Sequence, residues 1–118
     1  PSTIERRRHR RKYAEGELPP EQSFYFRGPA GQLNLRAHNL LLFMQLGEGV
    51  DQATWIHHLR SHDYSTWIKQ VIKDEALAQR VHDVEQQAHL PAEESRQLIR
   101  SAIEERYTVP AGGDEHTS

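Results

Sequence analysis

The chain alternates between apolar stripes at helical spacing and polar connections, and a short aromatic run precedes the first stripe. Phe24-Tyr25-Phe26 is typical of an extended segment that lies on a core. Gly28-Pro29-Ala30-Gly31 follows, with Pro second and Gly fourth, as a type I turn favours. The folded part is therefore predicted to begin with an extended segment and a turn.

The first helical stripe covers residues 33–46. One face carries Leu33, Ala37, Leu40, Leu41 and Met44, and a second stripe carries Leu35, Leu42 and Leu46. A helix that is apolar on most of its circumference is normally surrounded by others, so we expect this to be the central helix. Gly47 is expected to end it, as a left-handed C-terminal cap.

Capping residues mark the next helices. Asp51 is a good N-cap, with Val50 and Trp55 placed as a hydrophobic staple. Asp63 or Ser65 can cap the third helix. The apolar pattern shifts phase near Asp74, which predicts a kink or a break with Asp74 as a new cap.

The last helix is predicted to start at Pro91, which suits a first turn. Its buried stripe is expected to contain Leu98, Ile99, Ala102, Ile103 and Tyr107. Taken together, the patterns predict an all-α domain, a compact bundle of four to five helices over residues 24–107. Residues 1–23 are expected to form a basic arm, flexible or held by a partner, and residues 108–118 a disordered tail.

Composition narrows the possible chemistry. The 118 residues suit one domain and contain no cysteine, which excludes disulfides, cysteine-ligated metals and a thiol nucleophile. No stretch approaches the ~20 apolar residues of a membrane span, and no secretory signal is visible. We therefore expect a cytoplasmic protein that does not enter a membrane.

The net charge of −2 conceals an asymmetry. The basic arm carries Arg6, Arg7, Arg8, Arg10, Arg11 and Lys12. Such a cluster can bind phosphates or nucleic acid without reading sequence, but the rest of the chain is acidic and no aromatic side chain is interleaved to stack on bases. A linker or a contact with an acidic protein surface is the favoured interpretation. Arg27 and Arg36, beside the aromatic run, are further candidates for binding a partner or an anion.

Histidines offer a second candidate site. His57, His58 and His62 cluster with Asp63 between the second and third helices. His58 and His62 are four residues apart, which would place two imidazoles on one helical face, as a zinc pair requires. A metal site needs three or four converging ligands, so we expect these side chains to be structural and no metal or cofactor to be bound. A histidine-based metalloenzyme stays an open alternative.

Five stretches together look like a known pattern. They are residues 24–29 (Phe-Tyr-Phe-Arg-Gly-Pro), 33–40, 58–60, 63–68 (Asp-Tyr-Ser-x-Trp-Ile) and 72–78. The pattern resembles an uncharacterised bacterial family of small helical domains, similar to the C-terminal accessory domain of haloacid-dehalogenase-type sugar phosphatases. The resemblance implies an excised accessory domain whose catalytic part lies elsewhere. The Asp-x-Asp nucleophile motif of that superfamily does not occur in this sequence.

No set of residues assembles a general acid, a base and a pocket, and no phosphate-binding loop or serine elbow is present. We therefore predict a non-catalytic accessory or protein-interaction domain without catalytic residues. Its expected partner is another protein or a covalently linked catalytic domain. Binding of nucleic acid or a phosphate ligand through the basic arm is the alternative.

Overall fold

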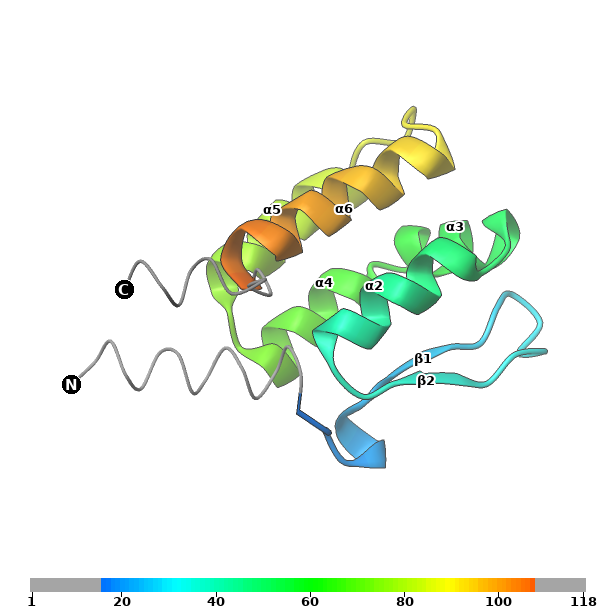
Figure 1. Ribbon diagram of the computed structural model, residues 1–118. Helices are drawn as coiled ribbons and strands as arrows, with labels where there is room; N and C mark the ends of the chain where they lie inside the picture. Colours follow the sequence, from blue (N-terminus) through cyan, green and yellow to red (C-terminus); the bar gives the residue numbers. More distant parts are fainter. Residues whose placement is uncertain (1–15, 108–118) are drawn as a thin grey trace.

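The computed structural model describes residues 16–107, which form a mostly helical domain with one small β-hairpin. In order, the elements are the 3-10 turn η1 (Pro20–Gln22), β1 (Phe24–Phe26), β2 (Leu35–Ala37), α2 (Leu40–Gly49), α3 (Gln52–Arg60), α4 (Asp63–Trp67), the π-helical η2 (Ile68–Ile72), α5 (Glu75–Glu85) and α6 (Ala92–Tyr107). Figure 1 shows the hairpin on one side of α2, α3 and α4, with α5 and α6 on the other. Helices dominate as predicted, but the hairpin means that the domain is not strictly all-α.

The hairpin corrects the predicted start of the central helix. β1 is extended as expected, and it pairs antiparallel with β2, with Phe24 opposite Ala37 and Phe26 opposite Leu35. Residues 33–39 were expected to be helical, yet their apolar positions also alternate with polar ones. That period of two fits a strand equally well, and pairing with β1 decides between the two. The predicted turn closes the hairpin through a hydrogen bond from Gly31 N–H to the Gly28 carbonyl, 3.1 Å.

Helix α2 begins later and ends later than predicted. Asn39, in an extended conformation, caps it by accepting a hydrogen bond from Leu42 N–H at 2.7 Å. Gly47 lies inside the helix, which continues to Gly49. A Cβ atom on Gly47 would lie 3.1 Å from Cζ3 of Trp55. The missing side chain therefore allows a close approach of the Trp55 ring and is not a cap.

Helix α3 starts as predicted. The Asp51 carboxylate accepts hydrogen bonds from Thr54 N–H at 3.1 Å and from the Thr54 hydroxyl at 2.6 Å. These two bonds lower the pKa of Asp51, mainly through the hydroxyl. Val50 and Trp55, the predicted staple residues, are both buried.

The predicted cap of α4 is wrong. The N-cap position belongs to His62, which adopts a left-handed conformation with φ of 60°, and no side chain caps the helix from there. The predicted break at Asp74 is confirmed: η2 ends at Lys73, which is also left-handed, and Asp74 then caps α5 through Leu77 N–H at 3.1 Å.

Helix α6 begins one residue after Pro91. Most of its predicted stripe is buried, but Leu98 is 41% exposed. No helix among residues 16–107 is both long and apolar enough to cross a membrane.

Aromatic side chains from several elements fill the centre of the domain. The buried members are Phe24, Phe26, Phe43, Trp55, Tyr64 and Trp67. Tyr64 contacts the rings of four other aromatic residues and of His58, and it donates its hydroxyl to the Trp55 carbonyl at 3.0 Å. Burial raises the pKa of the Tyr64 phenol, so it stays a neutral donor. Tyr25 points away from this core and is half-buried.

The folded body extends further towards the N-terminus than the predicted boundary at residue 24. Leu18 is 1% exposed and its N–H donates to the His38 carbonyl at 2.8 Å. Residues 16–23 thus belong to the domain, whereas residues 1–15 and the predicted tail at 108–118 lie outside the described residues.

Candidate functional site

The four residues proposed as metal ligands from the sequence lie at the corner between α3 and α4, but they do not converge. His58 points into the core, towards the hairpin. His62 faces α5 on another side of the corner, and its ring lies 5.0 Å from that of His82. His57 is half-buried and meets His58 edge-on. The fold therefore divides the cluster into two separate arrangements.

His58 joins the helical corner to the hairpin. Its Nδ1 lies 2.8 Å from Oδ2 of Asp63. Its Nε2 faces two backbone N–H groups, those of Arg27 at 3.0 Å and Gly28 at 3.4 Å. Because backbone N–H groups can only donate, Nε2 is the acceptor and Nδ1 carries the proton that Asp63 accepts.

A histidine oriented by an aspartate is also the arrangement of a general base. Here the nitrogen that would accept a substrate proton already accepts from the hairpin, and His58 is 5% exposed. The pair of His58 and Asp63 therefore holds the hairpin against the helices.

On the other side of the corner, His62, His82 and Glu85 come together. Their potential ligand atoms all lie within 4.8 Å of one another. His82 Nδ1 lies 3.6 Å from Oε1 of Glu85, one turn further along α5. His62 joins them across the left-handed turn that precedes α4. Among the described residues, no other group of histidines and acidic side chains converges in this way.

Ser65 fixes the carboxylate of this group. The Ser65 hydroxyl donates to Oε1 of Glu85 at 2.5 Å, and the Ser65 N–H donates to Oε2 at 3.0 Å. The Glu85 side chain is 0% exposed. Ser65 thus does not cap α4 with its own oxygen, and Glu85 from α5 binds the first turn of α4 in its place.

Two of these three residues escaped the sequence interpretation. His82 and Glu85 are three residues apart, so they share a face of α5, and that spacing was a visible signal. Nothing in the sequence showed that His62 would face them, because the contact depends on the turn at residues 61–62.

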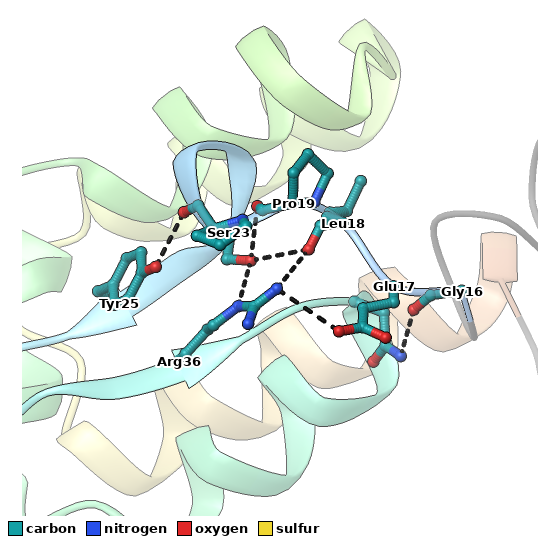
Figure 2. Close-up of polar contacts among 9 residues, drawn as sticks. Gly16, Glu17, Leu18, Pro19, Ser23, Tyr25 and Arg36 are labelled. Carbon is teal, nitrogen blue, oxygen red and sulfur yellow. Dashed lines mark hydrogen bonds and ion pairs between the residues drawn. The ribbon is translucent and has the colours of Figure 1, made fainter.

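Arg36, a predicted anion-binding residue, is engaged within the domain. Figure 2 shows its guanidinium between Ser23, the Leu18 carbonyl and Glu17. The distances are 3.0 Å to Ser23 Oγ, 2.7 Å to the Leu18 carbonyl and 3.8 Å to the Glu17 carboxylate. Arg36 therefore fastens the incoming segment to β2 and has little capacity left for an external anion.

Arg27 is the more accessible cation. It is exposed, lies over the Tyr25 ring at 4.7 Å and donates to Asn34 Oδ1 at 3.3 Å. A shallow depression beside it is lined by Pro20, Glu21, Ser23, Tyr25, Arg27 and Asn34. Since Glu21 shares this surface, it offers no concentrated positive charge. Arg6 to Lys12 of the basic arm lie outside the described residues.

Comparison of the chain with protein-family models, with curated proteins and with solved structures finds no match.

Proposed function

We propose that the chain is a non-catalytic helical accessory domain, which docks on a protein partner or on a covalently linked catalytic domain of the haloacid-dehalogenase phosphatase type. In this proposal the protein is bacterial and cytoplasmic, and residues 1–15 connect the domain to its partner. It needs no cofactor for this role.

The observation that carries the proposal is the attachment of residues 16–23. Leu18 is fully buried, Arg36 holds its carbonyl, and Asn39 Nδ2 donates to the Gly16 carbonyl at 2.8 Å. These contacts fix the direction in which the chain leaves the domain. A fixed chain direction at residue 16 limits the orientations that the domain can take relative to a partner, which lowers the entropy cost of docking. A loosely tethered module would gain nothing from such contacts.

The use of the polar side chains supports the same interpretation. His58 and Asp63 hold the hairpin, and Ser65 is bound to Glu85. Each of these residue types can serve catalysis, but here their reactive atoms already have partners within the domain.

The test uses the chain and a separately produced phosphatase core of the haloacid-dehalogenase type. Titration calorimetry is expected to show a one-to-one complex, and the chain alone is expected to hydrolyse no phosphorylated sugar above the buffer rate. Arg36→Ala should raise the Kd, and Arg60→Ala, which changes an exposed arginine on α3, should not.

Two results would overturn the proposal: turnover by the chain alone, or no complex with the core. Binding to DNA that weakens steeply with salt and disappears on deletion of residues 6–12 would replace it with the nucleic-acid alternative.

A further inference from the structure

The group of His62, His82 and Glu85 has no part in the proposed docking role. It joins the corner between α3 and α4 to the end of α5, and its potential ligand atoms all lie within 4.8 Å of one another. What this group can hold follows from the charge of Glu85 and from the types of ligand atom present.

Glu85 is a buried carboxylate with little compensating charge. Its side chain is 0% exposed, and both oxygens accept hydrogen bonds from Ser65. Within residues 16–107, the one basic side chain at ion-pair distance is His82, at 3.6 Å. A buried carboxylate is costly unless a cation or several donors accompany it, so the site favours a positively charged ligand.

The two histidines supply the remaining ligand atoms. Their rings meet edge to face at 88°, and both side chains are half-exposed. Glu85 closes the buried side of the group. A bound ion would therefore have protein ligands on one side and an open position towards solvent.

From this arrangement we propose that His62, His82 and Glu85 bind a divalent transition metal, with Zn²⁺ as the best match. Two imidazole nitrogens and one carboxylate oxygen form a donor set that zinc accepts, with a fourth position left for water or an external ligand. The hard cations Mg²⁺ and Ca²⁺ prefer oxygen ligands, and this group offers too few of them.

The distances fit with a small adjustment. In a tetrahedral zinc site with bonds of about 2.0–2.2 Å, neighbouring ligand atoms lie about 3.3–3.5 Å apart. His82 Nδ1 and Glu85 Oε1 already lie at 3.6 Å. Separations in the group reach at most 4.8 Å, and binding an ion would require the half-exposed histidines to rotate closer to Glu85.

Ser65 prepares the carboxylate for this role. Its N–H and hydroxyl fix the orientation of Glu85 before any ion arrives, as hydrogen bonds behind metal ligands commonly do. Removing the Ser65 hydroxyl is therefore expected to weaken binding without removing a ligand.

The experiment is calorimetric titration of the chelator-treated full chain with ZnCl₂ alone, together with the Co²⁺ absorption spectrum and the molar mass in solution. We expect one ion per chain and visible Co²⁺ bands typical of four-coordination. The molar mass in solution should be the same with and without the ion. His82→Gln should weaken binding at least about tenfold, and Ser65→Ala about tenfold.

His62→Asn removes a ligand while keeping a residue that tolerates the left-handed turn, so it should also weaken binding at least about tenfold. The matched controls are His57→Gln and His89→Gln, which remove histidines outside the group and should leave the affinity unchanged. Circular dichroism checks that each variant is folded.

Three outcomes would contradict the proposed metal site. They are the absence of stoichiometric binding, an equal loss of affinity in the control variants, and binding that occurs only between two chains.

Discussion

At the residue scale, polar atoms on large aromatic side chains hold distant segments together. Trp67 is 7% exposed and packs against Phe24 and Phe43. Its indole N–H donates to the Gln22 carbonyl at 2.8 Å, which connects α4 to the turn before β1. Trp67 therefore contributes both apolar burial and a hydrogen bond to the same contact.

Trp67→Ala is expected to lower the free energy of unfolding by about 3–5 kcal/mol, because a large buried side chain is removed. Trp67→Phe should cost clearly less, since it keeps most of the packing. Urea denaturation of the two variants measures the difference, and a loss below about 1 kcal/mol for Trp67→Ala would contradict the burial of this side chain.

Asp74 combines a helix cap with a contact between two helices. Its Oδ1 accepts from Leu77 N–H, and its Oδ2 accepts from Arg106 at 2.7 Å and from Tyr107 at 2.9 Å. Burial alone would raise the pKa of Asp74, but these hydrogen bonds and the charge of Arg106 outweigh it and lower the pKa. The carboxylate thus stabilises the fold in its ionised form.

A lowered pKa gives stability that is present above the unfolded pKa of about 3.9 and is lost as pH falls through the folded value. Asp74→Asn keeps an oxygen that can cap α5 but loses the negative charge that binds Arg106. It should therefore be less stable than the parent at pH 7, by about 1 kcal/mol, with a difference that narrows towards pH 3. Urea denaturation midpoints of the parent and of Asp74→Asn, measured between pH 7 and pH 3, test this prediction. Asp83→Asn, on the exposed face of α5, is the control and should show no such convergence.

At the scale of elements, one side chain from α3 binds the turn end of the hairpin. His58 accepts from the N–H groups of Arg27 and Gly28 while Asp63 binds its other nitrogen. Phe24 and Phe26 of β1 pack into the core that the helices provide, and an isolated two-stranded hairpin is marginally stable in water. The hairpin therefore owes its position to the helices.

His58→Leu leaves the two backbone N–H groups without an acceptor, at a cost of about 1–3 kcal/mol. We expect amide hydrogen exchange to rise in residues 24–37 more than in α6. His57→Leu, one residue earlier on the same helix, is the matched control. Equal exchange in both variants would show that His58 does not hold the hairpin.

The helices themselves were largely visible in the sequence, because their caps act locally. Asp51 and Asp74 each bond an N–H three residues ahead, so the cap and its helix can be identified from neighbouring residues. Gly47 was misinterpreted for the opposite reason. Its role depends on the approach of Trp55, and no local pattern reveals that approach.

At the scale of the whole molecule, residues 16–23 are fastened to the hairpin and the core. Arg36 bonds the Leu18 carbonyl and Ser23, while Leu18 fills the core beneath. Figure 1 shows this segment entering beside the hairpin, at the same end of the molecule as the last turn of α6.

Arg36→Ala should release residues 16–23 while the helices stay folded. Loss of a charged hydrogen bond of about 1.5–3 kcal/mol predicts at least about a tenfold fall in the exchange protection of the Leu18 amide. Hydrogen-exchange mass spectrometry measures it, with Arg60→Ala as the control. Unchanged protection would mean that the burial of Leu18 alone holds the segment.

The sequence by itself determined the number and order of the main helices, the aspartate caps of α3 and α5, and the break before α5, because each follows from periodicity or from bonds between near neighbours. Only the tertiary structure decided that residues 35–37 form a strand, that residues 16–23 belong to the body, and that His62 faces His82 and Glu85 and not His58. These features depend on contacts between residues far apart in the chain, where two local patterns were equally allowed and packing selected one.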